Sequence, residues 1–150
     1  MEINRVWDDP LSKRPHVDIL LDSSFVISLL KQRRDFEREL SEAIPKKIKI
    51  KIVDLVILEL ERLARKSSSA TRSWARASLE HLAKRDYQVV EHKTGPADVD
   101  ASLMALALSA ETSVAVATID RELRDGLSSL GIPVITPRKG HGLTVEGNIA

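Results

Sequence analysis

The sequence contains no cysteine and few aromatic residues, and both scarcities limit what the protein can be. Without cysteine the chain forms no disulfide, zinc ribbon or thiol nucleophile. Aromatic residues make up 3% of the 150 residues, so Leu, Ile, Val and Ala must fill the core. The sequence also lacks an apolar signal segment and any run of about 18 apolar residues. We therefore expect a cytoplasmic protein outside the membrane, in which any metal ion is bound by oxygen or imidazole ligands.

The remaining composition is that of one globular domain. Hydrophobic residues account for 43% of the chain and charged residues for 30%, and this length is enough to bury a core. The net charge of +1 neither requires nor excludes a polyanionic partner such as nucleic acid. The position of the charges must therefore decide between these alternatives.

Short apolar runs alternate with segments of helical periodicity from residue 17 onward. The predicted strands are 17–22, 48–53, 87–92, 114–120 and 132–136. The predicted helices are 24–43, 54–66, 70–85, 97–111 and 121–130. Such alternation is typical of an α/β fold with a mostly parallel sheet covered by helices. Residues 1–16, with two prolines, are predicted to be an irregular arm and residues 138–150 a basic, irregular tail, which leaves 17–137 as the domain.

Acidic residues follow two of the predicted strands and open one helix. Asp22 ends the first strand, Asp120 ends the fourth, and Asp98 and Asp100 open the helix near 97–111. Ligands of open α/β sheets bind outside the carboxyl ends of the strands, so these side chains are candidates for a site. The structural alternative for each is an N-cap, whose oxygen accepts from the free N–H groups of the first helical turn.

The neighbouring residues weaken the capping alternative at two of these positions. Ser23 and Ser24 can cap the helix after the first strand, so Asp22 is not required there. Only one of Asp98 and Asp100 can cap the same helix. We assign the cap to Asp98 and the functional role to Asp100.

Glu59 differs from its neighbour Glu61 in its helical surroundings. Glu61 has a basic residue four positions later, as expected on a solvated face. Glu59 has Leu55 and Leu63 four positions away on either side, with Arg62 as its helical counter-charge. An acid on an apolar stripe is costly unless it is hydrogen-bonded, paired or bound to a metal ion. A simple pair with Arg62 is the structural alternative.

Convergence of Asp22, Glu59, Asp100 and Asp120 would require a cation. Two like charges about 4 Å apart repel by roughly 4 kcal/mol at an effective dielectric constant of ~20. Because all the ligands are oxygens, Mg²⁺ or Mn²⁺ is the expected ion.

With these motifs the sequence resembles the PIN-domain nucleases. The matching pieces lie within residues 17–136 and read "LLDSSFV", "VILELERL", "DASLMALAL" and "ATIDREL". The resemblance implies a three-layer α/β/α fold with a five-stranded, mostly parallel sheet. It also implies a catalytic metal site, with ligands Asp22, Glu59, Asp100 and Asp120, supported by Thr118, Ser24 and Asp98. The spacing D-x-D leaves open which of Asp98 and Asp100 takes the family's third acidic position.

The resemblance further implies an endoribonuclease in which a metal-activated water hydrolyses RNA to a 5′ phosphate and a 3′ hydroxyl. "VILELERL" and "ATIDRELRDGLSSLGIPVI" are most similar to the archaeal and eukaryotic rRNA-processing branch, with the VapC toxins next. The corresponding partners would be a ribosome-assembly factor or an antitoxin, and homodimers are common in the family. A PIN module that binds RNA or protein without catalysis is the non-enzymatic alternative.

Basic side chains near the predicted site are candidates for RNA contact, with a solvated surface as the alternative for each. These candidates are Arg62, Arg121, Arg124, Arg138 and Lys139. Other α/β classes fit less well. The third predicted strand does not end in the Asp that a phosphoacceptor receiver needs, Ser24 stands where a dehalogenase-type phosphatase has its second acid, and no glycine-rich phosphate loop occurs.

Overall fold

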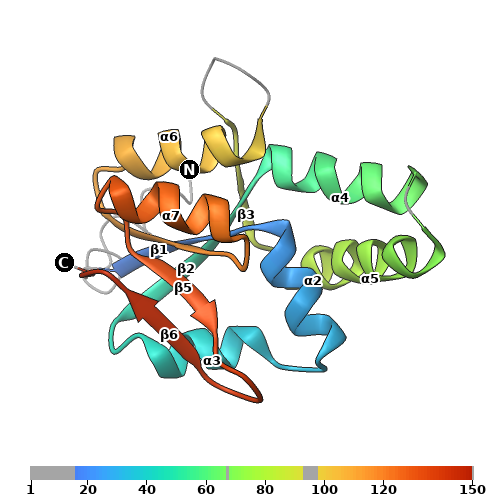
Figure 1. The fold of residues 1–150 in the computed structure, drawn as a ribbon, viewed down its shortest axis with the longest axis horizontal. Coiled ribbons are helices and arrows are strands. Elements are labelled where there is room, and N and C mark those ends of the chain that lie inside the picture. Colours follow the sequence, from blue (N-terminus) through green and yellow to red (C-terminus); the bar gives the residue numbers. More distant parts are fainter. Residues whose placement is uncertain (1–15, 67, 93–97, 150) are drawn as a thin grey trace, which may run out of the picture.

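The computed structural model describes residues 16–66, 68–92 and 98–149, and the predicted arm therefore lies outside the described residues apart from His16. Within these ranges six strands form one sheet in the order β3-β2-β1-β4-β5-β6 (Figure 1). Their bounds are β1 His16–Leu21, β2 Lys47–Val53, β3 Gln88–Val90, β4 Ser113–Ala117, β5 Val134–Pro137 and β6 Leu143–Glu146. β1 to β5 are mutually parallel, whereas β6 runs antiparallel to β5.

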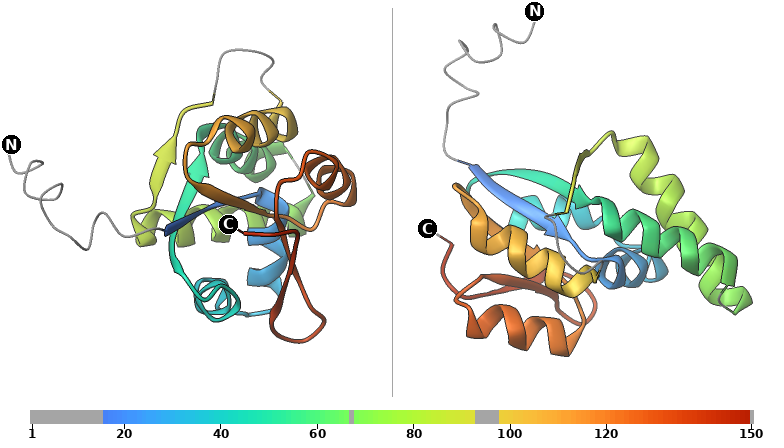
Figure 2. Two further views of the ribbon diagram at one scale, coloured as in Figure 1. Left: turned by 90° about the vertical axis from the view of Figure 1, so that its left-hand side faces the viewer. Right: turned by 90° about the horizontal axis from the view of Figure 1, so that it is seen from above.

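Helices cover both faces of the sheet. They are α2 Ser23–Lys31, α3 Phe36–Ala43, α4 Asp54–Lys66, α5 Ser69–Arg85, α6 Val99–Ser109 and α7 Arg121–Ser129. α6 and α7 lie together on one face and α2 and α3 on the other, while α4 and α5 form a hairpin packed side by side (Figures 1 and 2). The predicted three-layer α/β fold is confirmed. No helix in the described ranges is long and apolar enough to cross a membrane.

The core is centred on the two middle strands, β1 and β4. Ile19 and Leu21 of β1 and Val116 of β4 have no exposed surface. Burial of each such side chain contributes about 1.5–3 kcal/mol, so these strands form the most firmly held part of the fold. The polar residues that follow β1 and β4 are thus attached to a rigid support.

The sheet has one strand more than predicted. We expected five strands and an irregular tail at 138–150, but β6 lies within that tail and pairs with β5. Gly140 and Gly142 adopt positive φ in the turn between them, which glycine does without steric cost. β6 is short and only Leu143 in it is buried, so four residues of weak alternation gave too little signal to predict it.

The helix predicted at 24–43 is two helices. α2 ends at Lys31, Arg33 adopts a φ of 55°, and Asp35 caps α3 by accepting from the N–H of Arg38. The break places Arg34 in a buried position, where its guanidinium donates to the carbonyl oxygens of Arg138 and Gly142. The break between α2 and α3 therefore allows Arg34 to connect this part of the chain to the β5–β6 turn.

Candidate active site

The candidate site lies where the strand order of the sheet changes direction. β2 and β3 lie on one side of β1, whereas β5 and β6 lie on the opposite side of β4. β1 and β4 are neighbours, with Leu21 opposite Ala117, and the N–H of Asp22 donates to the carbonyl oxygen of Ala117 at 2.9 Å. Such switch points are where open α/β sheets bind ligands. The residues that follow β1 and β4 therefore lie side by side at the edge where a ligand is expected.

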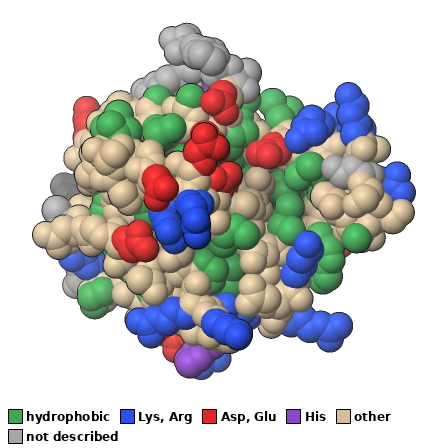
Figure 3. All heavy atoms as spheres, in the orientation of Figure 1, with side chains coloured by type: hydrophobic (Ala, Val, Ile, Leu, Met, Phe, Trp, Pro, Cys, Tyr) green, Lys and Arg blue, Asp and Glu red, His purple; other side chains and the backbone are tan. Residues whose placement is uncertain are grey.

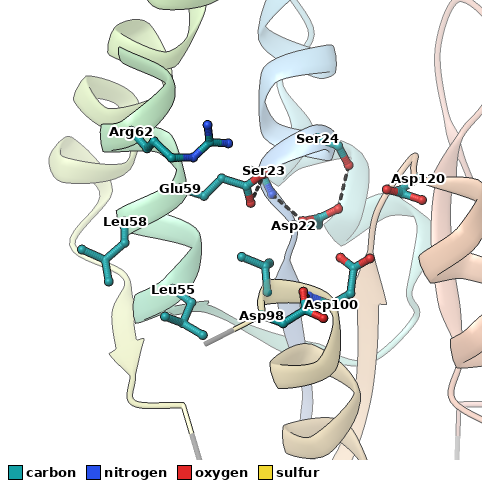
Figure 4. A pocket seen from close by; sticks show the side chains of 11 residues that line it. Asp22, Ser23, Ser24, Leu55, Leu58, Glu59, Arg62, Asp98, Asp100 and Asp120 are labelled. Atoms are coloured by element: carbon teal, nitrogen blue, oxygen red, sulfur yellow. Dashed lines mark hydrogen bonds between the residues drawn. The ribbon is translucent and has the colours of Figure 1, made fainter. Parts of the chain in front are cut away.

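Asp22 is buried, and both of its carboxylate oxygens accept hydrogen bonds. Oδ1 accepts from the N–H of Ser23 at 2.9 Å. Oδ2 accepts from the hydroxyl of Ser24 at 2.7 Å (Figure 4). It also accepts from the hydroxyl of Thr118 at 2.7 Å. These bonds compensate for the burial of a charge. Because a carboxylate has about four lone-pair positions, they still leave acceptor capacity for a cation.

Asp22 is also the N-cap of α2, so the inference that it is not required there, because Ser23 or Ser24 could cap, was wrong. The two serines already belong to the first turn of the helix. Ser23 Oγ donates to Glu59, and Ser24 Oγ donates to Asp22. The serines thus position acidic side chains, while the backbone of the helix start is capped by the acid itself.

Thr118 and Ser24 connect the ends of β1 and β4. Thr118 is fully buried, and its Oγ1 accepts from the N–H of Asp120 at 3.1 Å. Ser24 Oγ accepts from the N–H of Ile119 and lies 3.3 Å from Thr118 Oγ1. The two hydroxyls therefore hold Asp22 and the 118–120 segment in one arrangement.

Asp120 caps α7 with one of its two carboxylate oxygens. Its Oδ1 accepts from the N–H groups of Glu122 and Leu123, at 2.9 and 3.2 Å. The side chain is exposed and lines the same cleft as Asp22. Capping by Oδ1 fixes the carboxylate, and Oδ2 accepts from no helical N–H in the described part of the chain, so one oxygen is available to a ligand.

Glu59 reaches the site from α4, as its apolar helical surroundings suggested. Its Oε2 accepts from Ser23 Oγ at 3.2 Å. Burial raises the pKa of the Glu59 carboxyl above its ordinary value, and the charges of Asp22 and Asp120 raise it further, against the effects of Ser23 and Arg62. Arg62 lies in the same cleft but only partly offsets this effect, so a simple Glu59–Arg62 pair does not account for the position of the acid.

Asp98 and Asp100 take different positions at the start of α6. Asp98 is the N-cap and accepts from the N–H of Asp100 at 3.2 Å, as predicted. The side chain of Asp100 points toward Asp22 (Figure 4). Burial, followed by the charges of Asp22, Asp120, Asp98 and Glu59, raises the pKa of Asp100 to about 6. The acids therefore lie close enough to repel one another electrostatically.

Together these side chains border a cleft of about 560 Å³ between α2, α4, α6 and α7 (Figure 4). Acidic side chains gather in the middle of the same face in the space-filling view (Figure 3). One wall of the cleft is apolar and consists of Leu55, Leu58 and Val99. We did not predict this wall or the contact of Ser23 with Glu59. In the sequence, the apolar residues could not be distinguished from ordinary core positions. The only indication for Ser23 was its position directly after Asp22.

The four acids fit a divalent cation in the chemistry of their donors. All are carboxylates, whose oxygens are ligands that Mg²⁺ and Mn²⁺ favour, and Arg62 is the one basic side chain among the described residues that lines the cleft. Within the described ranges, no group of three or more His, Asp or Glu side chains is already arranged to hold a metal ion. The acids share a cleft without forming a finished coordination sphere, so binding of an ion would require their side chains to draw together.

The five basic residues predicted to contact RNA have different surroundings. Arg62 lines the cleft, Arg121 follows Asp120 at the start of α7, and Lys139 is exposed in the β5–β6 turn. Two of them have partners within the protein. Arg124 lies 4.0 Å from Glu146, and Arg138 donates to Thr144.

The fold and the site define an α/β/α protein with an acidic cleft at the switch point of its sheet. The chain belongs to the PIN-domain nuclease family, because residues 19–140 match the family model described as a PIN like domain. The archaeal Ribonuclease VapC4 of Methanocaldococcus jannaschii is 29% identical over 131 residues, which are 87% of this chain and 98% of that protein. The PIN domain endonuclease Utp24 superposes with a TM-score of 0.70 over 88% of this chain and 92% of its own, at 23% identity. At that identity the likeness concerns the fold.

Proposed function

We propose that the protein is a divalent-metal-dependent endoribonuclease that hydrolyses RNA phosphodiester bonds. The observation that carries the proposal is the arrival of Asp22, Glu59, Asp100 and Asp120 at one cleft from four separate parts of the chain. Membership of a nuclease family and the ribonuclease name of the M. jannaschii relative support it. An acidic cleft repels a polyanion unless a cation is present, and this supports Mg²⁺ or Mn²⁺ as the cofactor.

In this proposal Asp22, Glu59, Asp100 and Asp120 hold the metal ion. When bound, Mg²⁺ or Mn²⁺ supplies the activation of water and the stabilisation of charge on the leaving 3′ oxygen. Asp22 is kept in place by Thr118 and Ser24, because catalysis by positioned groups tolerates little displacement. Asp100 has to lose its proton before it can act as a ligand, and its raised pKa makes that step sensitive to pH.

For the biological role we propose rRNA processing or RNA turnover, with a VapC-type toxin as the second candidate. The toxin candidate is favoured by one specific observation, the match to Ribonuclease VapC4 over 98% of that protein's length. A toxin requires an antitoxin partner. A small antitoxin gene directly upstream, or a small protein that co-purifies and inhibits cleavage, would decide for the toxin role.

The test is Mn²⁺-dependent cleavage of a structured RNA by the purified protein and by Asp22→Asn. Asp125→Asn is the matched control, because it removes an exposed acid of α7 that does not line the cleft. We expect cleavage by the wild type and by Asp125→Asn, with products that end in a 5′ phosphate and a 3′ hydroxyl, and at least a hundredfold loss in Asp22→Asn. Equal activity of Asp22→Asn, or no activity in any of the three proteins, would contradict the proposal.

A further inference from the structure

We propose that the end of the α4–α5 hairpin binds the backbone of the RNA substrate, an inference that rests on the proposed ribonuclease function. Residues 62–76 contain five basic residues and no acidic one. The five are Arg62, Arg65, Lys66, Arg72 and Arg76, and we call them the basic hairpin tip. This stretch joins the end of α4 to the start of α5.

The basic hairpin tip contributes little to the packing of the domain. Ala64 on α4 and Ala75 on α5 are the buried residues nearest the turn, and none of the described residues between them is buried. Arg65, Lys66, Arg72 and Arg76 form no ion pair with any acid in the described ranges. Figure 1 shows the two helices extending side by side beyond the sheet. Arg65, Lys66 and Arg76 are exposed, and the half-buried Arg72 donates only to Ser69 Oγ among the described residues, so these charges are available to an external partner.

Helix stability does not explain this charge pattern. Arg65 and Lys66 stand in the last turn of α4, where a positive charge complements the helix dipole. Arg72 gains no stabilisation from the helix dipole, because it lies near the start of α5. Arg62 and Lys66, and likewise Arg72 and Arg76, are like charges four residues apart on one helix, which is a destabilising arrangement. A polyanion that binds the tip would relieve this repulsion.

The position of the tip relative to the cleft points to RNA as that polyanion. Arg62 lines the cleft one helical turn beyond Glu59, and Lys66 lies roughly 10 Å farther along α4 than Glu59 at 1.5 Å per residue. In the space-filling view, acidic side chains gather near the middle of the face, and basic side chains lie at its end at the hairpin as well as along its lower edge (Figure 3). The acids repel phosphates, so attraction close to the cleft is needed to keep the strand there. A strand held at the tip would enter the cleft within a few nucleotides.

The first test measures binding apart from cleavage. Arg65, Lys66, Arg72 and Arg76 are replaced together by Gln, and Arg62 is kept because it lines the cleft. Binding of a fluorescein-labelled single-stranded RNA is followed by anisotropy in EDTA at several salt concentrations. We expect at least about tenfold weaker binding than wild type. The plot of log K against log[salt] should be shallower by about 0.7 for each phosphate that the variant no longer neutralises, up to about 2.8.

The matched control removes the same charge elsewhere. Lys31, Lys47, Lys49 and Lys84 are exposed and lie outside the cleft, and we expect their joint replacement by Gln to leave the affinity and the salt slope near wild type. Equal binding by the two quadruple variants would overturn the inference, because the attraction would then depend on overall charge alone. The proposed function is judged separately, by Asp22-dependent cleavage, so failure of one is distinguishable from failure of the other.

A second test does not depend on removing charges. Because the chain has no cysteine, Ser69→Cys at the tip and Ser41→Cys on α3 can each carry a single benzophenone label. We expect RNA crosslinks from position 69 and few from position 41. If position 69 captures no RNA, or if an acidic protein segment displaces RNA from it while RNA cleavage is unchanged, the tip is not an RNA-binding surface.

Discussion

The hydroxyl of Thr118 donates a 2.7 Å hydrogen bond to Asp22 Oδ2, across 96 positions of sequence. Thr118 is fully buried and Asp22 is nearly so. Their contact is made at the ends of the two central strands, β1 and β4. The orientation of Asp22 therefore depends directly on the pairing of these strands.

Thr118→Val removes this hydroxyl while almost keeping the shape of the side chain. It deprives Asp22 of a donor and the N–H of Asp120 of its acceptor, so we expect the free energy of unfolding to fall by about 1–3 kcal/mol. Cleavage should fall at least about tenfold because Asp22 is no longer held in one orientation. Urea denaturation and an RNA cleavage assay measure the two effects. Thr118→Ser keeps the hydroxyl and serves as the control, and equal cleavage by the two variants would show that the hydrogen bond has no role.

Glu59→Gln and Glu61→Gln form a matched pair on α4. Glu59 lines the acidic cleft, whereas Glu61 does not. Glu59→Gln removes one candidate metal ligand. It also removes a negative charge that burial and the nearby Asp22 and Asp120 disfavour. We expect Mn²⁺ affinity, measured by calorimetry, to fall at least about tenfold in Glu59→Gln and to stay near wild type in Glu61→Gln. Unchanged Mn²⁺ binding in Glu59→Gln would remove this residue from the ligand set.

The raised pKa of Asp100 predicts how stability depends on pH when no divalent cation is present. Between its ordinary value of 3.8 and about 6, the folded protein binds more protons at this site than the unfolded chain does. The free energy of unfolding therefore decreases as pH rises through this window, and it stays lower at neutral pH, where Asp100 is ionised in the folded protein. Asp100→Asn should remove this destabilising charge and raise the free energy of unfolding at pH 7 by roughly 1 kcal/mol, after allowance for solvent screening of a partly exposed group.

Thermal unfolding in EDTA at pH 4 and pH 7 tests this prediction. The gain in Asp100→Asn should be present at pH 7 and small at pH 4, because the wild-type carboxyl is largely protonated at the lower pH. The same pKa predicts that Mn²⁺ binding by the wild type weakens as pH falls through about 6, since the ligand must be ionised. A gain of equal size at both pH values would point to a cause other than this charge.

Arg34 holds the β5–β6 turn, and Arg34→Met tests how much stability that contact provides. The guanidinium pairs with both carboxylate oxygens of Glu39, at 2.9 and 2.6 Å, in a largely buried position. Removal leaves Glu39 without its cation and should cost about 3–5 kcal/mol. Arg38→Met, which breaks an exposed 3.9 Å pair with Glu42, should cost less than about 0.5 kcal/mol. Similar urea midpoints for the two variants would contradict the proposed role of Arg34.

The sequence was sufficient to predict the alternation of strands and helices, because buried strands and amphipathic helices leave a periodic pattern in the residues themselves. It also indicated that Asp22 and Asp120 follow the ends of strands, and that Glu59 lies on an apolar stripe. The convergence of these acids could be proposed from the rule that parallel strands present their carboxyl ends at one edge. Their role as metal ligands stays a prediction.

Tertiary structure decided the features that involve partners distant in sequence. The hydroxyls of Thr118 and Ser23 reach Asp22 and Glu59 only because β4 and α4 are placed beside β1 and α2. Arg34 lies where the predicted long helix is interrupted, and there it binds a turn more than 100 residues away. Periodicity reports whether a residue is buried. It carries no information on which side chain a buried polar group meets, and that depends on strand register and on the packing of helices over the sheet.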